Sequence, residues 1–217
     1  MSTSDQPLRI DIVSDIVCPW CVIGYRQLAE ALKATGTAHE IFWQPFELNP
    51  DMPATGQNMR EHLSEKYGLS LQESEANRLR LSEAGAKVGF EFAFRDDSRM
   101  HNTFNAHQLL HWADQQERMH DLKQALFSAH FSHNRNLSDK AVLVAIAAEI
   151  GLDSIEARAV LEDQRFAEEV RNAEHILQKR GVQGVPAIIF NQRHLVSGAQ
   201  GVENFTLILQ QLAVAQD

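Results

Sequence analysis

The apolar positions near the start of the chain follow first a strand-like and then a helix-like pattern. Residues 8–14 alternate apolar and polar side chains, which predicts a strand with one face in the core. From Pro19 the apolar positions recur at helical spacing as far as Gly36. A proline suits the first turn of a helix because its missing N–H needs no partner there. The sequence therefore predicts that a strand leads directly into a helix near residue 18.

The middle of the chain is dominated by helical signals. A second strand is predicted over residues 39–48, and residues 55–160 then read as a series of helices. Ser70 and Glu73 form a capping-box pattern at the start of one of these helices. Ser138 is predicted to cap another.

Strand chemistry returns near the end of the chain. An amphipathic helix is predicted to end at Gly181, and residues 186–190 and 194–199 then read as a hairpin before a last helix. The strands at the two ends are expected to share one sheet. The predicted organisation is one α/β domain, formed by residues 1–54 and 161–217, that carries an all-helical insertion at residues 55–160.

Composition limits the function classes. The chain has 217 residues, 44% of them hydrophobic, which is enough for a core without disulfide support. Its 20 basic and 29 acidic residues give a net charge of −9, so neither a nucleic acid nor an anionic membrane surface is an expected partner. The N-terminal stretch lacks the features of a signal peptide, and no apolar run is long enough to cross a bilayer. We therefore expect a cytoplasmic protein, unless a leader has been removed.

Both cysteines of the chain, Cys18 and Cys21, lie in the stretch VCPWCV, at the predicted junction of strand and helix. In a reducing compartment two closely spaced thiols more often indicate redox catalysis or metal binding than a structural disulfide. Backbone N–H groups and the helix dipole favour a thiolate at a helix N-terminus. We expect Cys18 to be the exposed nucleophile and Cys21 the resolving thiol.

Two other interpretations of the cysteines stay open. Zinc needs about four ligands, and although His107 and His111 have the i, i+4 spacing of a ligand pair, no local Cys–His spacing resembles a zinc ribbon. A buried pair with no chemistry is the second possibility, because cysteine is often simply buried. No metal site is expected.

Four motifs together resemble a known family. They are DIVCPWCVIG at 15–24, WQPFELNP at 43–50, RMHNTFNAHQLLHWA at 99–113 and GVQGVPAIIFN at 181–191. The chain resembles the DsbA family, and in particular its FrnE-like branch, to which 2-hydroxychromene-2-carboxylate isomerases and kappa-class glutathione transferases are related. This resemblance implies a thioredoxin-like α/β fold with a helical insertion.

The resemblance also implies a binding site for the partner. The Val185–Pro186 bond is expected to be cis and to lie beside Cys18, so that the Val185 backbone pairs with an extended substrate. Pro19 and Trp20 lie between the cysteines, and Trp20 is expected to offer apolar contact to the partner.

In the family the 99–113 region faces the active-site groove. Asn102, Asn105 and His107 are therefore candidates for substrate binding. Trp43 and Trp112 are expected in the core instead.

The chain departs from its relatives at two positions near the cysteines. Many thioredoxin-like proteins carry an acid about six residues before the first cysteine, where this chain has Ile12, so the group that handles the proton of Cys21 is open. DsbA has histidine where this chain has Trp20. We therefore predict a Cys18 pKa of about 5–7, less depressed than the lowest values known for such thiols.

The predicted function is thiol–disulfide exchange with a protein, a peptide or a small thiol. No metal, nucleotide or flavin is implied, and glutathione is a possible co-substrate. A glutathione-dependent isomerase or transferase acting on a small aromatic compound is the first alternative, although such relatives usually have serine at the position of Cys18. A metal-binding or redox-sensing module is the second. The chain could also form a homodimer.

Overall fold

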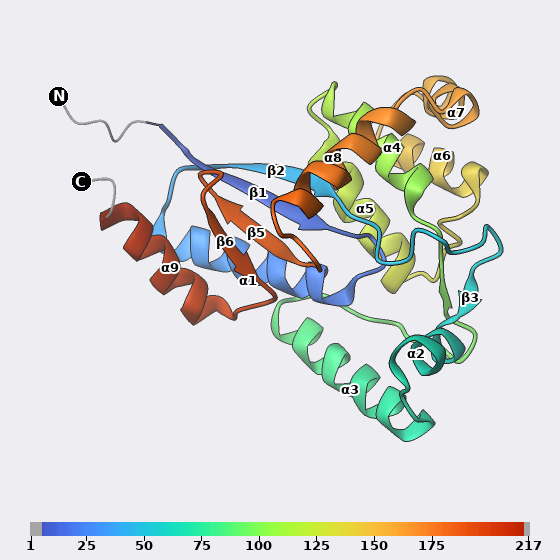
Figure 1. Ribbon diagram of the computed structural model, residues 1–217, viewed down its shortest axis with the longest axis horizontal. Coiled ribbons are helices and arrows are strands. Elements are labelled where there is room, and N and C mark those ends of the chain that lie inside the picture. The colour runs from blue at the N-terminus through green and yellow to red at the C-terminus, as the bar shows by residue number, and fades with distance from the viewer. Residues whose placement is uncertain (1–5, 215–217) are drawn as a thin grey trace.

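The computed structural model describes residues 6–214 and is built around a four-stranded sheet (Figure 1). The strand order is β2-β1-β5-β6, with β1 parallel to β2 and β5 antiparallel to both of its neighbours. These strands are β1 (Leu8–Ser14), β2 (His39–Pro45), β5 (Ala187–Phe190) and β6 (His194–Ser197). The first and last parts of the chain thus share one sheet, as predicted.

Helices cover both faces of this sheet. Helices α1 (Pro19–Thr35) and α9 (Val202–Val214) pack against each other, and α8 (Ala167–Lys179) packs along β2. Alternation along the strands explains the two layers, because successive side chains point to opposite faces. Ile12 and Ile188 belong to the main core with α1 and α9, whereas Val13 belongs to a smaller cluster with residues of α8 and β5.

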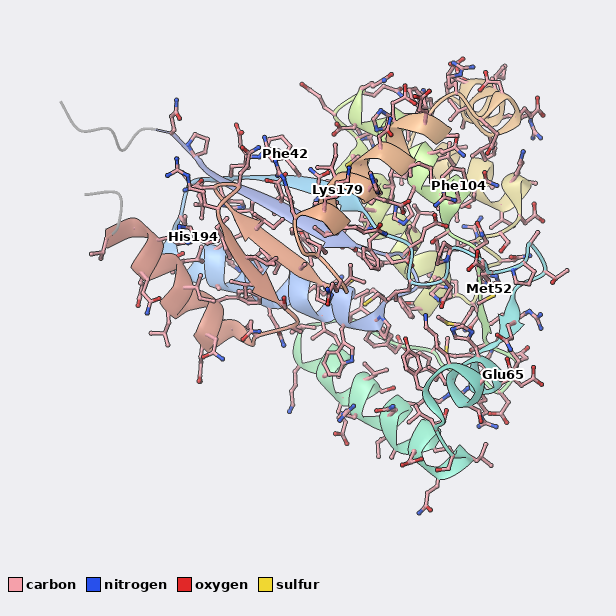
Figure 2. All side chains as sticks on the ribbon, in the orientation of Figure 1. Phe42, Met52, Glu65, Phe104, Lys179 and His194 are labelled. Carbon is pink, nitrogen blue, oxygen red and sulfur yellow. The ribbon has the colours of Figure 1, made fainter. Side chains whose placement is uncertain are left out.

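The chain between β2 and α8 forms the helical insertion. Its elements are β3 (Gln57–Asn58), α2 (Met59–Tyr67), α3 (Leu71–Lys87), β4 (Arg99–Met100), α4 (Phe104–Asp114), α5 (Met119–Phe131), α6 (Lys140–Glu149) and α7 (Ser154–Asp163). Figure 2 shows the insertion at one end of the molecule, marked by Met52 and Glu65, and the β6 edge with His194 at the other. A mixed α/β fold with a helical insertion is confirmed, but the insertion is not all-helical, because β3 and β4 pair within it. The boundaries at residues 54/55 and 160/161 stay a prediction.

Local signals set most helix ends where the sequence predicts them. Helix α1 begins at Pro19 and ends at Gly36, whose φ of 65° is left-handed. The Ser70–Glu73 capping box is present in full. The prediction that Ser138 caps α6 is wrong, because the next residue, Asp139, accepts the N–H of Ala141 at 2.8 Å.

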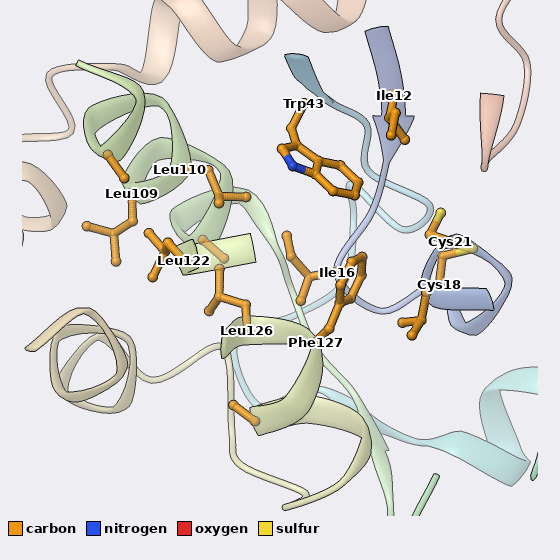
Figure 3. Close-up of a cluster of buried hydrophobic side chains, with 14 of the residues drawn as sticks. Ile12, Ile16, Cys18, Cys21, Trp43, Leu109, Leu110, Leu122, Leu126 and Phe127 are labelled. Atoms are coloured by element: carbon orange, nitrogen blue, oxygen red, sulfur yellow. The ribbon is translucent and has the colours of Figure 1, made fainter. Parts of the chain in front are cut away.

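The core continues from the sheet into the insertion. Figure 3 shows Trp43 of β2 and Phe127 of α5 between the cysteines and a group of leucines on α4 and α5. Trp43 and Trp112 are buried, as predicted. Each large apolar side chain buried in this way contributes about 1.5–3 kcal/mol, so this continuous core fixes α4 and α5 against the cysteine-bearing end of the sheet. Within residues 6–214, no helix has the length and apolar character needed to cross a membrane.

Candidate active site

Cys18 occupies the N-cap of α1, at the end of the short turn that leaves β1. Its backbone is extended and its N–H donates to the Asp15 carbonyl at 3.3 Å. The Cys21 N–H donates to the Cys18 carbonyl at 3.1 Å, which closes the first turn and places the two thiols on the same side of it. Both thiols are free, and the first turn of α1 holds no acidic residue that would oppose a thiolate.

The loop before β5 lies against this thiol. The Val185–Pro186 peptide bond is cis, and the Cys18 Sγ–H donates to the Val185 carbonyl at 3.6 Å. The next carbonyl, that of Pro186, is held by the N–H of Gly198 at 2.8 Å. Segments 167 residues apart in the chain therefore meet at the sulfur of Cys18.

A cavity of about 440 Å³ opens beside Cys18. Its floor is formed by Cys18, Pro19, Trp20 and Val185, and its walls come mainly from α2 and α3 of the insertion. The walls are largely apolar and include Leu63, Tyr67, Leu69, Leu81, Phe94 and Met100. A few polar residues interrupt them, namely Asn49, Ser74 and Arg78, each of which has a buried side-chain atom without a partner among residues 6–214. The cavity therefore brings Cys18 together with three of the predicted contact residues, Pro19, Trp20 and Val185.

Cys18 is less accessible than its sequence position suggests. Only 4% of the residue is exposed, so the expectation of an exposed nucleophile is wrong for this arrangement. Burial raises the pKa of the Cys18 thiol well above its ordinary value, and the Cys21 thiol adds to the rise, while the Cys21 N–H acts in the opposite direction. The predicted pKa of about 5–7 assumed a solvated thiol at the helix end. In this arrangement Cys18 is held as a neutral thiol.

His107 does not line the cavity beside Cys18, contrary to the prediction. This side chain is buried, and its Nε2 lies 3.1 Å from the Phe46 carbonyl and 3.4 Å from Oδ1 of Asp15. Asp15 is fully buried and also accepts the Leu48 N–H at 2.7 Å. His107 thus ties α4 to the ends of β1 and β2 instead of facing the cavity beside Cys18.

The Asp15 carboxylate is held in its charged form by these contacts. Burial raises the pKa of Asp15, but the His107 hydrogen bond, the Leu48 N–H and the charge of Lys123 together bring it below its ordinary value. The nearby Asp11 pairs with Arg9 and Gln44 instead. The buried anion next to the CPWC turn is therefore Asp15.

Asn105 and Asn102 are also structural in this arrangement. The Asn105 Oδ1 accepts the Gln164 amide at 3.0 Å, which joins α4 to the end of α7. Asn102 donates to the Met52 carbonyl at 3.0 Å and accepts the Phe104 N–H at 3.1 Å. Neither lines the cavity beside Cys18, which the 99–113 region reaches through Met100, so the expectation that Asn102, Asn105 and His107 contact the substrate there is not supported by the geometry.

Lys123 on α5 also belongs to this site, although it is not among the residues predicted from the sequence. This lysine is 1% exposed, and its Nζ donates to the Ser14 carbonyl at 3.3 Å, directly behind the CPWC turn. Burial lowers the pKa of Lys123 to about 8, and attraction to Cys21, Asp15 and Cys18 limits the fall. Its position in the sequence does indicate burial, because Lys123 lies four residues before Phe127 on the apolar face of the helix.

Residues 6–214 contain no group of three or more His, Cys, Asp or Glu side chains placed to hold a metal ion.

The comparisons with known proteins agree with this geometry. The profile of the DSBA-like thioredoxin domain matches residues 9–210, almost the whole chain. A probable DsbA oxidoreductase from Streptomyces coelicolor is 36% identical, and its crystal structure superposes with a TM-score of 0.88 over 94% of this chain and 89% of that one. The chain belongs to the DsbA-like thioredoxin family.

More distant relatives extend the comparison. The protein YwbO of Bacillus subtilis is 29% identical over 199 residues, which cover 91% of this chain and 94% of YwbO. The cytosolic disulfide reductase DsbM from Pseudomonas aeruginosa, solved with glutathione, has the same fold at 15% identity, with a TM-score of 0.65 over 94% of this chain and 98% of DsbM. The predicted family and the thioredoxin-like fold class are therefore confirmed for this DsbA-like chain. The FrnE-like branch stays a prediction.

Proposed function

We propose that this DsbA-like protein catalyses thiol–disulfide exchange, with Cys18 as nucleophile and Cys21 as resolving thiol. The observation that carries the proposal is the position of the Cys18 sulfur. It lies at the N-terminus of α1, faces the Val185 carbonyl and lines a cavity large enough for a partner. A helix N-terminus favours negative charge, so it supports the thiolate that forms when Cys18 loses its proton to water.

The exchange takes place in two steps. The Cys18 thiolate attacks one sulfur of a disulfide R–S–S–R′, a bond from Cys18 to the R sulfur forms, and R′–S⁻ leaves with the electron pair and takes a proton from water. The Cys21 thiolate then attacks the Cys18 sulfur, closes the Cys18–Cys21 disulfide and releases R–S⁻. Two electrons pass from the two cysteines to the substrate.

The surroundings of the thiol favour a partner with an apolar side chain next to its sulfur. Trp20 and the apolar walls of α2 and α3 border the cavity, and Val185 lines it too, which supports a role of its backbone in aligning an extended chain. In a cytosol near the glutathione poise the pair would be mostly reduced, which favours reduction or isomerisation of disulfides over net oxidation. Glutathione is the proposed small-thiol partner for recycling.

Equilibration with glutathione redox buffers, followed by acid trapping and mass spectrometry, tests the exchange. The wild type should convert between a dithiol and an internal disulfide. Cys21→Ser should accumulate a mixed disulfide that carries one glutathione, whereas Cys18→Ser should form none. A wild-type protein that stays a dithiol at every glutathione ratio would contradict the proposal.

The size and apolar character of the cavity also favour one alternative, a glutathione-dependent reaction of a small aromatic compound. Cys18→Ser separates the two functions, because serine can still orient glutathione but cannot exchange a disulfide. Conversion of an aromatic substrate by Cys18→Ser at the wild-type rate would support the alternative.

A further inference from the structure

The chain has a buried lysine, Lys123, behind the CPWC turn, and an isoleucine at the strand position where many thioredoxin-like proteins carry an acid. Ile12 occupies the strand position at which an acid is expected, and its side chain is fully buried among apolar neighbours. The carboxylates nearest in sequence are engaged elsewhere, Asp11 with Arg9 and Asp15 with His107. Among the residues that the structure describes, Lys123 is the buried lysine at this end of the sheet, and it enters from the insertion rather than from the sheet.

Lys123 is held close to the thiols. Its Nζ donates to the carbonyl of Ser14, the last residue of β1, four positions before Cys18. It lies over the rings of Trp43 and Phe127, at 5.4 and 5.2 Å from their centroids. Figure 3 shows both rings on one side of the cysteines, between the thiols and the leucines of α4 and α5. The charge of Lys123 acts on Cys21 more strongly than on Cys18.

A second cavity reaches Lys123 from the side away from the substrate. It has a volume of about 190 Å³, room for several waters, and it shares no lining residue with the cavity beside Cys18. Its lining runs from the buried Lys123 and His107 to the exposed Asp114 at the surface. Lys123 thus lies between the CPWC turn, where its charge acts on Cys21, and a cavity that reaches the surface at Asp114.

We propose that Lys123 is the proton relay of Cys21, and that the cavity between α4, α5, α8 and β2 connects this relay to solvent. The proposal rests on the exchange reaction proposed above and assigns its missing proton-handling group.

The relay moves one proton for each disulfide that Cys21 resolves. In the mixed disulfide, the proton of the Cys21 thiol passes through one water to the neutral Lys123 amine, which becomes an ammonium. The Cys21 thiolate attacks the Cys18 sulfur, the Cys18–Cys21 bond forms, and the substrate thiolate leaves with the electron pair of the broken bond. The ammonium then gives its proton to water in the cavity. Reduction of the pair runs the same transfers backwards.

The groups around Lys123 support this role. A lysine with a pKa of about 8 exchanges protons readily near neutrality, unlike an exposed lysine. The lining contributed by β2 and α8 is uncharged. The titratable or charged groups that face Lys123 or its cavity are Cys18 and Cys21 of α1, Asp15 of the turn, His107, His111 and Asp114 of α4, and His120 of α5.

Two-phase kinetics with dithiobis(nitrobenzoate) test the relay. The first thionitrobenzoate is released when Cys18 attacks the reagent, and the second when Cys21 resolves the mixed disulfide. Lys123→Met should slow the second phase about tenfold or more at neutral pH and move its pH midpoint upward, while the first phase changes little. Lys140→Met is the matched control, because Lys140 is an exposed lysine that also donates to a backbone carbonyl, that of Leu161.

Chemical rescue distinguishes a relay from a packing role. Lys123→Ala leaves the cavity open to small amines, so added ethylamine should restore the second phase in proportion to its concentration, and it should not affect the control. If Lys123→Met fails to fold, the rescue in Lys123→Ala decides alone. A wild type that releases no second thionitrobenzoate refutes the exchange reaction itself. Normal exchange with an unchanged second phase in Lys123→Met, or no rescue in Lys123→Ala, overturns the relay.

Discussion

Replacement of Lys123 by methionine should stabilise the reduced protein. The pKa of Lys123 falls from 10.5 to about 8 on folding, chiefly because burial penalises the ammonium. At about 1.4 kcal/mol per pKa unit, holding the charged form in the core costs about 3 kcal/mol at neutral pH. Methionine fills a similar volume without charge and gives up the hydrogen bond to Ser14, worth about 1 kcal/mol. The expected net gain is about 2 kcal/mol in the free energy of unfolding.

The pH dependence of this gain follows from the direction of the pKa shift. Below about pH 8 the lysine is charged in both folded and unfolded wild type, so the whole penalty is present. Between about pH 8 and the unfolded value of 10.5 the unfolded chain holds more protons than the folded one, so wild-type stability rises with pH. The advantage of Lys123→Met should therefore shrink over this interval and be lost at its upper end.

Urea unfolding of the reduced proteins, followed by circular dichroism at several pH values, measures the effect. The expected gain corresponds to a rise of about 4–8 °C in the melting temperature for a chain of this size. Lys140→Met should change the free energy of unfolding by no more than about 0.5 kcal/mol. A loss of stability in Lys123→Met at neutral pH, or a gain that does not vary with pH, would refute the idea that the buried ammonium is costly.

Two further substitutions probe the insertion. Neither ring nitrogen of the buried His130 has a partner among the described residues, and burial lowers the pKa of His130 from 6.5 to about 3. The unfolded chain therefore takes up a proton below about pH 6.5 that the folded chain resists, so wild-type stability should fall by a few kcal/mol towards about pH 3. His130→Leu should lessen this loss when unfolding is followed as a function of acid pH. Identical unfolding curves for the wild type and His130→Leu would argue against a neutral buried imidazole. A Cβ added at Gly85 would stand 2.5 Å from the Phe92 ring and 2.7 Å from the Phe90 carbonyl. Gly85→Ala should therefore lower the free energy of unfolding in urea by about 1–3 kcal/mol. An unchanged urea midpoint would mean that the segment with Phe90 and Phe92 moves aside without cost.

The parts of the site that depend on local chain chemistry are predictable from the sequence. The strand-to-helix junction at Cys18 follows from alternation, a proline at the first helical position and a glycine past the last. The resemblance added what spacing alone does not supply, namely the approach of Val185 and Pro186 to Cys18 from 167 residues away.

The environments of the side chains depend on tertiary packing and were predicted less well. Cys18 is buried because the insertion covers the end of α1, which no local pattern reveals. His107 has the spacing of a functional histidine, yet its partner is the Phe46 carbonyl, 61 residues away. A lysine on a helix is ordinarily a solvated residue. Lys123 differs because Trp43 of β2 closes over it, and that contact exists only in the folded chain.

Different helices of the insertion contact the two sides of the CPWC turn. On the outer side, α2 and α3 form most of the cavity wall beside the nucleophile, so variation there changes which partner reaches Cys18. On the inner side, α4 and α5 supply His107 and Lys123, so variation there changes how the charges behind the cysteines are balanced. A sheet that holds only the two thiols would present a nucleophile without a shaped cavity and a resolving thiol without a nearby base. In the proposed exchange the insertion therefore contributes to both half-reactions, through the cavity wall beside Cys18 and through Lys123 behind the CPWC turn.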